Sequence, residues 1–421
     1  MQTELADFIR GTCEGREADA ILRKCVHCGF CTATCPTYQL LGDELDGPRG
    51  RIYLIKGMLE GGEVTARTQL HLDRCLTCRA CETTCPSGVQ YGRLVDIGRR
   101  LAEERVPRPI LPRLLRLALR TVLPRRTLFA SLLGLGRLLR PVLPFALQHK
   151  IPAKVPAAGA WPAARHARRM LVLAGCVQPA LSPDINAASA RVLDQLGISL
   201  IEAPAAGCCG AVRFHLNAQE DGLADMRALI DAWWPYVEAA DGSGARGVEA
   251  IVMSASGCGV TVKEYGQLLA HDPVYAAKAE KISALTKDLS EVIAAELDRL
   301  EPLLAGTTPP AAGSKLALQL PCTLQHGQKI SGLIERILVA AGFELTPVAD
   351  SHLCCGSAGT FSILQPELSA RLKANKLAAL HAGSPQTIVS ANIGCLSHLR
   401  SGTALPLEHW IVALERRVAG S

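Results

Sequence analysis

Two short cysteine runs near the N-terminus have the residue type and the spacing of iron–sulfur ligands. The first run, CVHCGFCTATCP, begins at Cys25, and the second, CLTCRACETTCP, begins at Cys75. Both follow the pattern C-x2-C-x2-C-x3-C-P, in which three cysteines of a tight loop reach three corners of one iron–sulfur cube. The fourth cysteine is turned away by the proline after it and ligates the other cube, so the pattern predicts two clusters that exchange ligands.

This exchange assigns four cysteines to each of two [4Fe–4S] clusters. Cluster 1 takes Cys25, Cys28, Cys31 and Cys85, and cluster 2 takes Cys75, Cys78, Cys81 and Cys35. Structural zinc is the alternative, but zinc sites favour two separated C-x2-C pairs over four cysteines in one run. Arg74 and Arg79 flank the second run, and they would raise the potential of cluster 2 unless both point into solvent.

Eight further cysteines form a second, looser repeat. In each half a single cysteine follows an apolar run, a Cys-Cys pair comes after the same interval, and a Gly-Cys closes the half. The first half contains Cys176, Cys208, Cys209 and Cys258, and the second contains Cys322, Cys354, Cys355 and Cys395. We expect a metal or iron–sulfur site in each half, because thiolates gathered this closely repel one another unless a cation neutralises them.

Two alternatives stay open for these eight cysteines, namely structural zinc and thiol pairs that form redox disulfides. The N-terminus has no apolar signal segment, so we expect a reducing compartment, which disfavours disulfides. Cys13 is left over from an odd total of 17 cysteines and is interpreted as a bystander. Four histidines near the cysteines are not predicted to be ligands: His215, His326, His352 and His398.

Short apolar strands must position the second repeat, because each cysteine group comes just after one of them. We expect strands at 170–175, 198–203 and 249–254, and again at 315–320, 343–348 and 387–392. Uninterrupted apolar runs of this length are typical of parallel strands that helices cover on both faces. In such sheets ligands bind at the carboxyl edge, which is where the cysteines are expected.

The predicted fold is α+β and α/β. An α-helical, bacterial-type two-cluster ferredoxin domain is followed by two repeated α/β cysteine-rich units, which we call the first and second CCG units. The predicted boundaries are 1–104 for the ferredoxin-type domain, 105–169 for a basic amphipathic connecting segment, 170–305 for the first CCG unit and 314–421 for the second. A chain of 421 residues is long for one domain, which agrees with this division.

The connecting segment is basic and amphipathic. From Arg105 to Pro183 the chain has no acidic residue, although its total net charge is only +6. Leucines accompany the arginines at helical spacing, with Arg113, Arg116 and Arg120 on one face, which predicts one or two helices lying on an anionic membrane surface. The alternative is an apolar face packed on this chain's own core or on a partner subunit. No apolar stretch is long enough to span a bilayer, and no nucleic-acid partner is expected.

Together these motifs resemble the iron–sulfur subunits of bacterial glycolate oxidases. The resemblance is carried by the two cysteine runs and by DELDGPRGR, GCCGAV, SASGCG, PCTLQH, DSHLCCGSAGT and ANIGC. It implies a peripheral complex on the cytoplasmic face of the inner membrane, in which flavin-binding partner subunits oxidise glycolate, and related 2-hydroxy acids such as D-lactate, to the oxo acid. This chain would pass the electrons to a respiratory-chain acceptor such as quinone and would not oxidise the substrate itself.

Other functions stay open on the residues alone. One is the iron–sulfur subunit of a related dehydrogenase for glycerol-3-phosphate or lactate, and another is a thiol/disulfide catalyst similar to heterodisulfide reductase. A purely structural role for the clusters is disfavoured, because one cluster would suffice to stabilise a fold. No G-x-G-x-x-G run follows a predicted strand, so the chain is not predicted to bind flavin or nicotinamide, and no catalytic residue is assigned.

Overall fold

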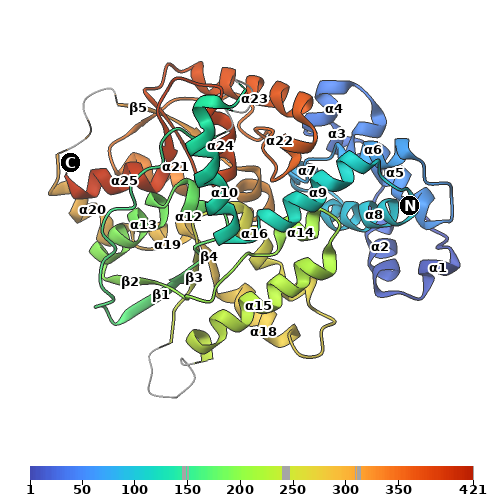
Figure 1. Ribbon diagram of the computed structural model, residues 1–421, viewed down its shortest axis with the longest axis horizontal. Coiled ribbons are helices and arrows are strands. Elements are labelled where there is room, and N and C mark those ends of the chain that lie inside the picture. The colour runs from blue at the N-terminus through green and yellow to red at the C-terminus, as the bar shows by residue number, and fades with distance from the viewer. Residues whose placement is uncertain (145–147, 149–150, 239–246, 309, 311–313, 421) are drawn as a thin grey trace.

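The computed structural model describes residues 1–144, 148, 151–238, 247–308, 310 and 314–420. Its N-terminal part is helical and is followed by two parallel sheets with helices around them, which confirms the predicted fold class. Figure 1 shows the N-terminal part, in blue, at one end of the molecule, with the α/β part beside it.

The N-terminal part packs short helices around one apolar core. Its elements are α1 (Asp7–Arg10), α2 (Cys13–Lys24), α3 (Phe30–Ala33), α4 (Pro36–Leu41), η1 (Glu44–Asp46), α5 (Pro48–Leu59), α6 (Ala66–Asp73), α7 (Ala80–Thr84) and α8 (Tyr91–Arg105). Helices α5 and α8 approach so closely that a Cβ on Gly98 would lie 2.6 Å from a side-chain carbon of Ile55. Because α2 leads into the first cysteine run and α6 into the second, this core positions both runs.

Each CCG unit contains a four-stranded parallel sheet. The first sheet has the order β2-β1-β3-β4, with β1 (Arg168–Val172), β2 (Ile198–Glu202), β3 (Ile251–Met253) and β4 (Thr286–Asp288). The second has the order β6-β5-β7-β8, with β5 (Lys315–Gln319), β6 (Glu344–Leu345), β7 (Thr387–Ser390) and β8 (Leu407–His409). A strand forms in all six predicted places. Strands β4 and β8 were not predicted, because three residues with a charged centre carry no apolar run.

Helices follow the strands in both units. In the first unit they are α12 (Gln178–Leu181), α13 (Asp184–Gln195), α14 (Ala211–His215), α15 (Gln219–Glu238), α16 (Ser256–Lys263), α17 (Tyr265–Leu268), α18 (Ala276–Leu285), α19 (Leu289–Ala295) and α20 (Leu297–Ala305). In the second they are η4 (Thr323–Gly327, a π-helix), α21 (Leu333–Ala340), α22 (Phe361–Leu364), α23 (Pro366–His381), α24 (Ile393–Arg400) and α25 (Trp410–Ala419). One apolar core runs through both units and includes Leu193 of α13 and Trp410 of α25.

Two helices of the connecting segment leave an apolar face exposed. Helix α9 (Ile110–Val122) and helix α10 (Arg126–Leu139) are followed by η2 (Arg140–Val142), and they link the N-terminal part to the first CCG unit (Figure 1). Leu111 of α9 is 79% exposed and Leu138 of α10 is 76% exposed. These leucines therefore do not pack on the protein's own core. Within the described residues, no helix combines the length and the apolar character needed to cross a membrane.

Arg116 departs from the basic face that was predicted for this segment. Its side chain is buried, and its Nη2 lies 3.1 Å from Oδ1 of Asp73, which also pairs with Arg108 at 2.6 Å. Of the three arginines expected on one face, Arg113 is exposed and Arg120 is partly covered. Arg116 thus anchors α9 to the N-terminal part instead of facing outward.

Candidate functional site

The two cysteine runs have the same unusual backbone conformation. His27 and Thr77, at equivalent positions of the repeat, have positive φ angles of 58° and 52°. Two residues later, Gly29 and Arg79 have φ angles of 86° and 62°, and each precedes a short helix, α3 or α7. Non-glycine residues rarely adopt this left-handed region, and they do so mostly at sites where function requires the strain. The sequence repeat is therefore a repeat of loop geometry.

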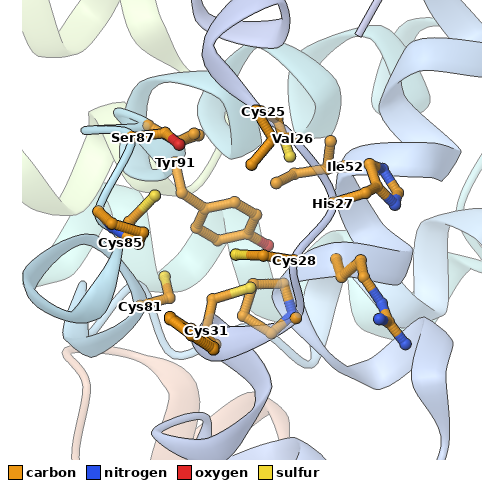
Figure 2. A pocket seen from close by; sticks show the side chains of 16 residues that line it. Cys25, Val26, His27, Cys28, Cys31, Ile52, Cys81, Cys85, Ser87 and Tyr91 are labelled. Carbon is orange, nitrogen blue, oxygen red and sulfur yellow. The ribbon is translucent and has the colours of Figure 1, made fainter.

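One cavity brings together the four cysteines predicted for cluster 1. Its walls include Cys25, Cys28, Cys31 and Cys85, and it encloses about 450 Å³ of space, part of which is open to solvent. Figure 2 shows these cysteines around the ring of Tyr91. Cys28 is exposed and Cys25 is buried, so this cavity reaches the molecular surface on the Cys28 side.

A second cavity brings together the four cysteines predicted for cluster 2. Its walls include Cys35, Cys75, Cys78 and Cys81. Three of them are buried and only Cys78 is partly exposed, so this site is more enclosed than the first. Cys35 comes from the first run and Cys85 from the second, so each cavity receives its fourth cysteine from the other run, as the exchange of ligands requires.

The residues of both cavities suit iron–sulfur clusters. All eight candidate ligands are thiols, which are the donors that bind such clusters. Burial, together with the nearby Cys25 thiol, raises the pKa of Cys31 to about 11, so a bound metal is needed to hold it as a thiolate. The Tyr91 hydroxyl is buried near the Cys75 thiol, and its ring borders both cavities. A buried hydroxyl donor beside a candidate ligand fits the acceptor sulfurs of a bound cluster.

Arg51, which lines the second cavity, forms a buried charge pair with Asp46. Arg51 and Asp46 are 1% and 0% exposed, and Nη2 of Arg51 donates to Oδ1 of Asp46 at 3.4 Å. Nε of Arg51 also donates to the carbonyl of His71 at 2.7 Å. Arg51 is not among the residues that the sequence predicts for this site. The sequence does contain a clue to it, because Arg51 lies one turn before Ile55 on the apolar face of α5, where a charged side chain needs a buried partner.

Asp46 also lies close to Asp43 and His71, at distances that a metal ion could bridge. However, its carboxylate already accepts hydrogen bonds from Arg51 and, at 2.8 Å, from Nη1 of Arg74. These cations satisfy the charge of Asp46, so the group serves as a structural ion-pair network rather than a metal centre.

Arg74 and Arg79 do not point freely into solvent. Arg74 pairs with Asp46, while Nε of Arg79 lies 3.0 Å from Oε2 of Glu82 and its Nη1 pairs with Glu264 of the first CCG unit. Each guanidinium thus has a carboxylate beside it. The net positive charge that these two arginines were expected to place near cluster 2 is reduced accordingly.

In the first CCG unit the four cysteines form one contact group. Cys208 interacts electrostatically with both Cys176 and Cys209, and Cys209 does so with Cys258, which places the four thiols near one another. Hydrogen bonding to Cys208 and burial raise the pKa of Cys176. Gly210, with a φ of 83°, lets the chain turn directly after the pair. A larger residue would not fit there, because its Cβ would lie 2.5 Å from the carbonyl oxygen of Gly222.

In the second CCG unit the four cysteines gather in the same way. Sγ of Cys322 lies 3.8 Å from Sγ of Cys354, and Sγ of Cys355 lies 3.4 Å from Sγ of Cys395. All four are buried and free of disulfides. Separations of this size are too long for S–S bonds, which measure about 2.05 Å, and leave the thiols free to share a metal.

The second cavity and the second CCG unit adjoin one another. Cys78 and Leu76 belong to an apolar cluster that also contains Cys322, Cys354 and Phe361. Two sets of predicted ligands, separated by more than half of the chain, thus share one buried contact region. The sequence predicts the two sets in separate domains and does not predict this junction.

Three of the four histidines near the cysteines bond to other protein groups. His215 Nδ1 lies 3.2 Å from Asp96 Oδ1, and His398 Nε2 lies 3.2 Å from Ser369 Oγ. His326 Nε2 lies 2.8 Å from the carbonyl of His352, and its Nδ1 faces Thr83. Each of these rings thus has a protein partner, and the prediction that the histidines are not ligands stays a prediction.

Comparisons with known proteins match both parts of the chain. Residues 21–89 match the family described as a 4Fe-4S dicluster domain, and residues 170–263 and 316–400 match the family described as a cysteine-rich domain. The chain is 56% identical to the glycolate oxidase iron-sulfur subunit of Escherichia coli (strain K12), over 99% of both chains.

Two more distant relatives have related names. The chain is 31% identical to the probable glycolate oxidase iron-sulfur subunit of Bacillus subtilis (strain 168), over 90% of this chain and 89% of the relative. It is 25% identical to the lactate utilization protein A of an Exiguobacterium species, over 53% of this chain and 85% of the relative.

Proposed function

This chain belongs to the family of glycolate oxidase iron–sulfur subunits, and from that premise we propose that it is the electron-transfer subunit of a complex that oxidises glycolate to glyoxylate. Flavin-binding partner subunits remove the electrons from glycolate, and related 2-hydroxy acids such as D-lactate are further candidate substrates. The observation that carries the proposal is that Cys78 packs against the apolar cluster containing Cys322 and Cys354, which brings the candidate ligands of the N-terminal part near those of the second CCG unit.

For the N-terminal clusters we propose the exchanged ligand sets. Cys25, Cys28, Cys31 and Cys85 hold cluster 1, and Cys75, Cys78, Cys81 and Cys35 hold cluster 2, which the composition of the two cavity walls supports. When bound, each cluster supplies one-electron chemistry. The protein's own part is to supply the thiolates, to shield the second cavity from water, and to leave the first open at Cys28.

For the CCG units we propose one metal or iron–sulfur site each. The four thiols of each unit contact one another, and none forms a disulfide within the described structure. Gathered and buried thiols of this kind are stabilised by a metal cation, which adds folding free energy. The second unit's site then continues the series of redox centres, because it adjoins the cluster 2 ligands.

For the connecting segment we propose that α9 and α10 hold the complex at the cytoplasmic face of the inner membrane, close to a quinone acceptor. Their exposed leucines would enter the lipid interface, while Arg113, Arg125, Arg126 and Arg137, which are exposed, would face anionic headgroups. The exposure of the apolar face supports contact with a membrane or a partner over packing on this chain's own core.

The function is tested by co-purifying the chain anaerobically with its flavin-binding subunits and adding glycolate. We expect glycolate to reduce the clusters, seen by EPR, and to support dye or quinone reduction by the complex but not by the isolated chain. Disulfide reduction by the isolated chain, with no response of the clusters to glycolate, would favour the thiol/disulfide catalyst instead.

A further inference from the structure

Lys376 is a buried cation without an acidic partner. It lies on α23 and is only 4% exposed. Its Nζ donates to the carbonyl oxygens of Asp350, at 2.9 Å, and Ser351, at 3.3 Å. In the part of the chain that the structure describes, it forms no ion pair with a carboxylate. Burying an ammonium group is unfavourable unless a negative charge compensates it, so its retention here needs an explanation.

The side chain lies on the face of α23 that covers the cysteines of the second CCG unit. Ser369, Leu372 and Lys376 recur at the helical spacing that places residues on one face. Ser369 Oγ donates to the carbonyl of Gly356 at 2.7 Å, and Leu372 packs in the cluster that contains Cys354. The two carbonyls that bind Nζ belong to the loop just before Cys354.

The four thiols of this unit are the anionic groups that Lys376 can face. Burial lowers the pKa of Lys376, and negative charge on the thiols would raise it, with Cys355 and Cys354 acting most strongly. Cys322 and Cys395 act in the same direction. The ammonium group, bound to the loop that runs into Cys354, thus lies on the side of α23 that faces this cysteine pair.

The first CCG unit has an apolar residue at the equivalent place. A Cβ on Gly210 would meet the carbonyl oxygen of Gly222 at 2.5 Å, and a Cβ on Gly356 would meet that of Ser369 at 2.8 Å, so Gly222 and Ser369 occupy equivalent positions. Aligned on them, α15 and α23 bury corresponding residues. The pairs are Leu229 with Lys376, Ile230 with Leu377, and Trp233 with Leu380. At this position the second unit therefore has a buried cation, whereas in the first unit the cation that acts on Cys208, Arg213, is paired with Asp225.

We propose that Lys376 is the counter-charge of the four-cysteine site in the second CCG unit, so that this site holds an anionic metal–thiolate centre more firmly than the site in the first unit. A cation beside the thiols favours their ionised form and offsets the negative charge that a metal leaves uncompensated. The proposal concerns charge at this site, and it stands whether or not glycolate is the substrate.

Thermal melting of the full-length chain, with its metals and after their removal, tests the proposal, because the change in melting temperature should have opposite signs in the two states. We expect Lys376→Met to lower the melting temperature of the metal-loaded chain and to raise that of the metal-free chain, where the buried cation has no compensation. Lys376→Arg, which keeps the charge, should lie close to the parent chain when loaded. Leu229→Met is the matched control and should change both states little. A fall of similar size in both states would show a purely structural lysine and overturn the proposal.

Metal retention gives a second readout on the same variants. The metal of the second CCG unit is first defined as the amount lost in the double variant Cys354→Ser/Cys355→Ser. We expect Lys376→Met to lose this amount at roughly 10–100-fold lower chelator concentration, the range typical when a residue supporting metal ligands is removed. Two results would also overturn the proposal. In the first, Lys376→Met retains the metal as well as Leu229→Met does. In the second, Lys376→Arg loses the metal although Lys376→Met keeps it.

Discussion

The hydroxyl oxygen of Thr83 lies 3.0 Å from Nδ1 of His326, although 243 positions separate the two residues in the chain. Thr83 stands between Cys81 and Cys85 of the second cysteine run, and His326 belongs to the π-helix that follows Cys322. The contact therefore ties the ligand loop of cluster 2 to the ligand loop of the second CCG unit. Insertions of this π type occur frequently at functional sites.

The exchange of ligands predicts which of the two EPR signals each single cysteine variant alters. Cys28→Ser and Cys85→Ser should alter the same EPR signal, because both residues line the first cavity, although they belong to different runs. Cys78→Ser and Cys35→Ser should alter the other signal. All four should also weaken the N-terminal part as a whole, since Cys81 and Tyr91 border both cavities. If the signals grouped instead by run, with Cys28 and Cys35 together, the exchanged sets would be wrong.

Arg51 is expected to set the potential of cluster 2. Removing a buried positive charge from the wall of that cavity in Arg51→Met disfavours the more negative, reduced cluster. The potential of cluster 2 should fall by several tens of millivolts, given that about 59 mV corresponds to a tenfold change for a one-electron couple. EPR-monitored redox titration measures both clusters in one experiment.

Arg49→Met is the matched control for Arg51→Met. Arg49 borders the first cavity, but its side chain is 38% exposed and pairs with Glu44, so solvent screens its charge. A smaller shift, confined to cluster 1, is expected. Equal shifts of both clusters in both variants would mean that the long-range field, and not the buried position of Arg51, determines the potentials.

The cysteine pair of the second CCG unit should be needed for electron delivery. Cys354→Ser/Cys355→Ser is expected to lower the metal content and to slow reduction of the acceptor, while glycolate still reduces the flavin in the partner subunits. Metal analysis and stopped-flow flavin spectra measure these two effects separately. If the parent chain contains only the iron of the two N-terminal clusters and no zinc, the proposed metal sites of the CCG units are wrong, and the redox-disulfide alternative replaces them.

The exposed leucines of α9 and α10 should govern vesicle binding. Leu111→Ser and Leu138→Ser are expected to weaken flotation with vesicles. Added salt should weaken binding to anionic vesicles, because it screens an attraction of about 1 kcal/mol per engaged basic residue. Val274→Ser changes a residue that is 65% exposed in the first CCG unit and serves as the control. Equal binding of the parent chain to neutral and anionic vesicles would leave docking to a partner subunit as the role of this face.

Arg116 belongs to a different class from the exposed arginines of α9. Because it is buried against Asp73, Arg116→Ala should lower the stability of the N-terminal part, whereas Arg113→Ala should mainly reduce binding to anionic vesicles. Asp73 keeps its pair with Arg108, so the cost should be smaller than the roughly 3–5 kcal/mol typical when a buried charge is left unpaired. Thermal melting and vesicle flotation on both variants separate the two effects.

Local spacing was sufficient to predict the cysteine loops and the strands. Three cysteines within one short loop can reach one cluster only in a few backbone conformations, and His27 and Thr77 adopt the same one in both runs. The six apolar strands likewise follow from runs that are legible in the sequence, because each strand buries its own residues against helices. The short strands β4 and β8 lacked such a signal.

Only the tertiary structure decided which charges are buried and which ligand sets meet. Arg51, Arg116 and Lys376 look like ordinary helix arginines and lysines in the sequence, and the groups that bind them belong to other elements of the fold. The same is true of the junction between Cys78 and Cys322. The physical reason is that the spacing of residues along a helix determines which of them share a face, whereas the partner that covers this face depends on packing between elements hundreds of residues apart.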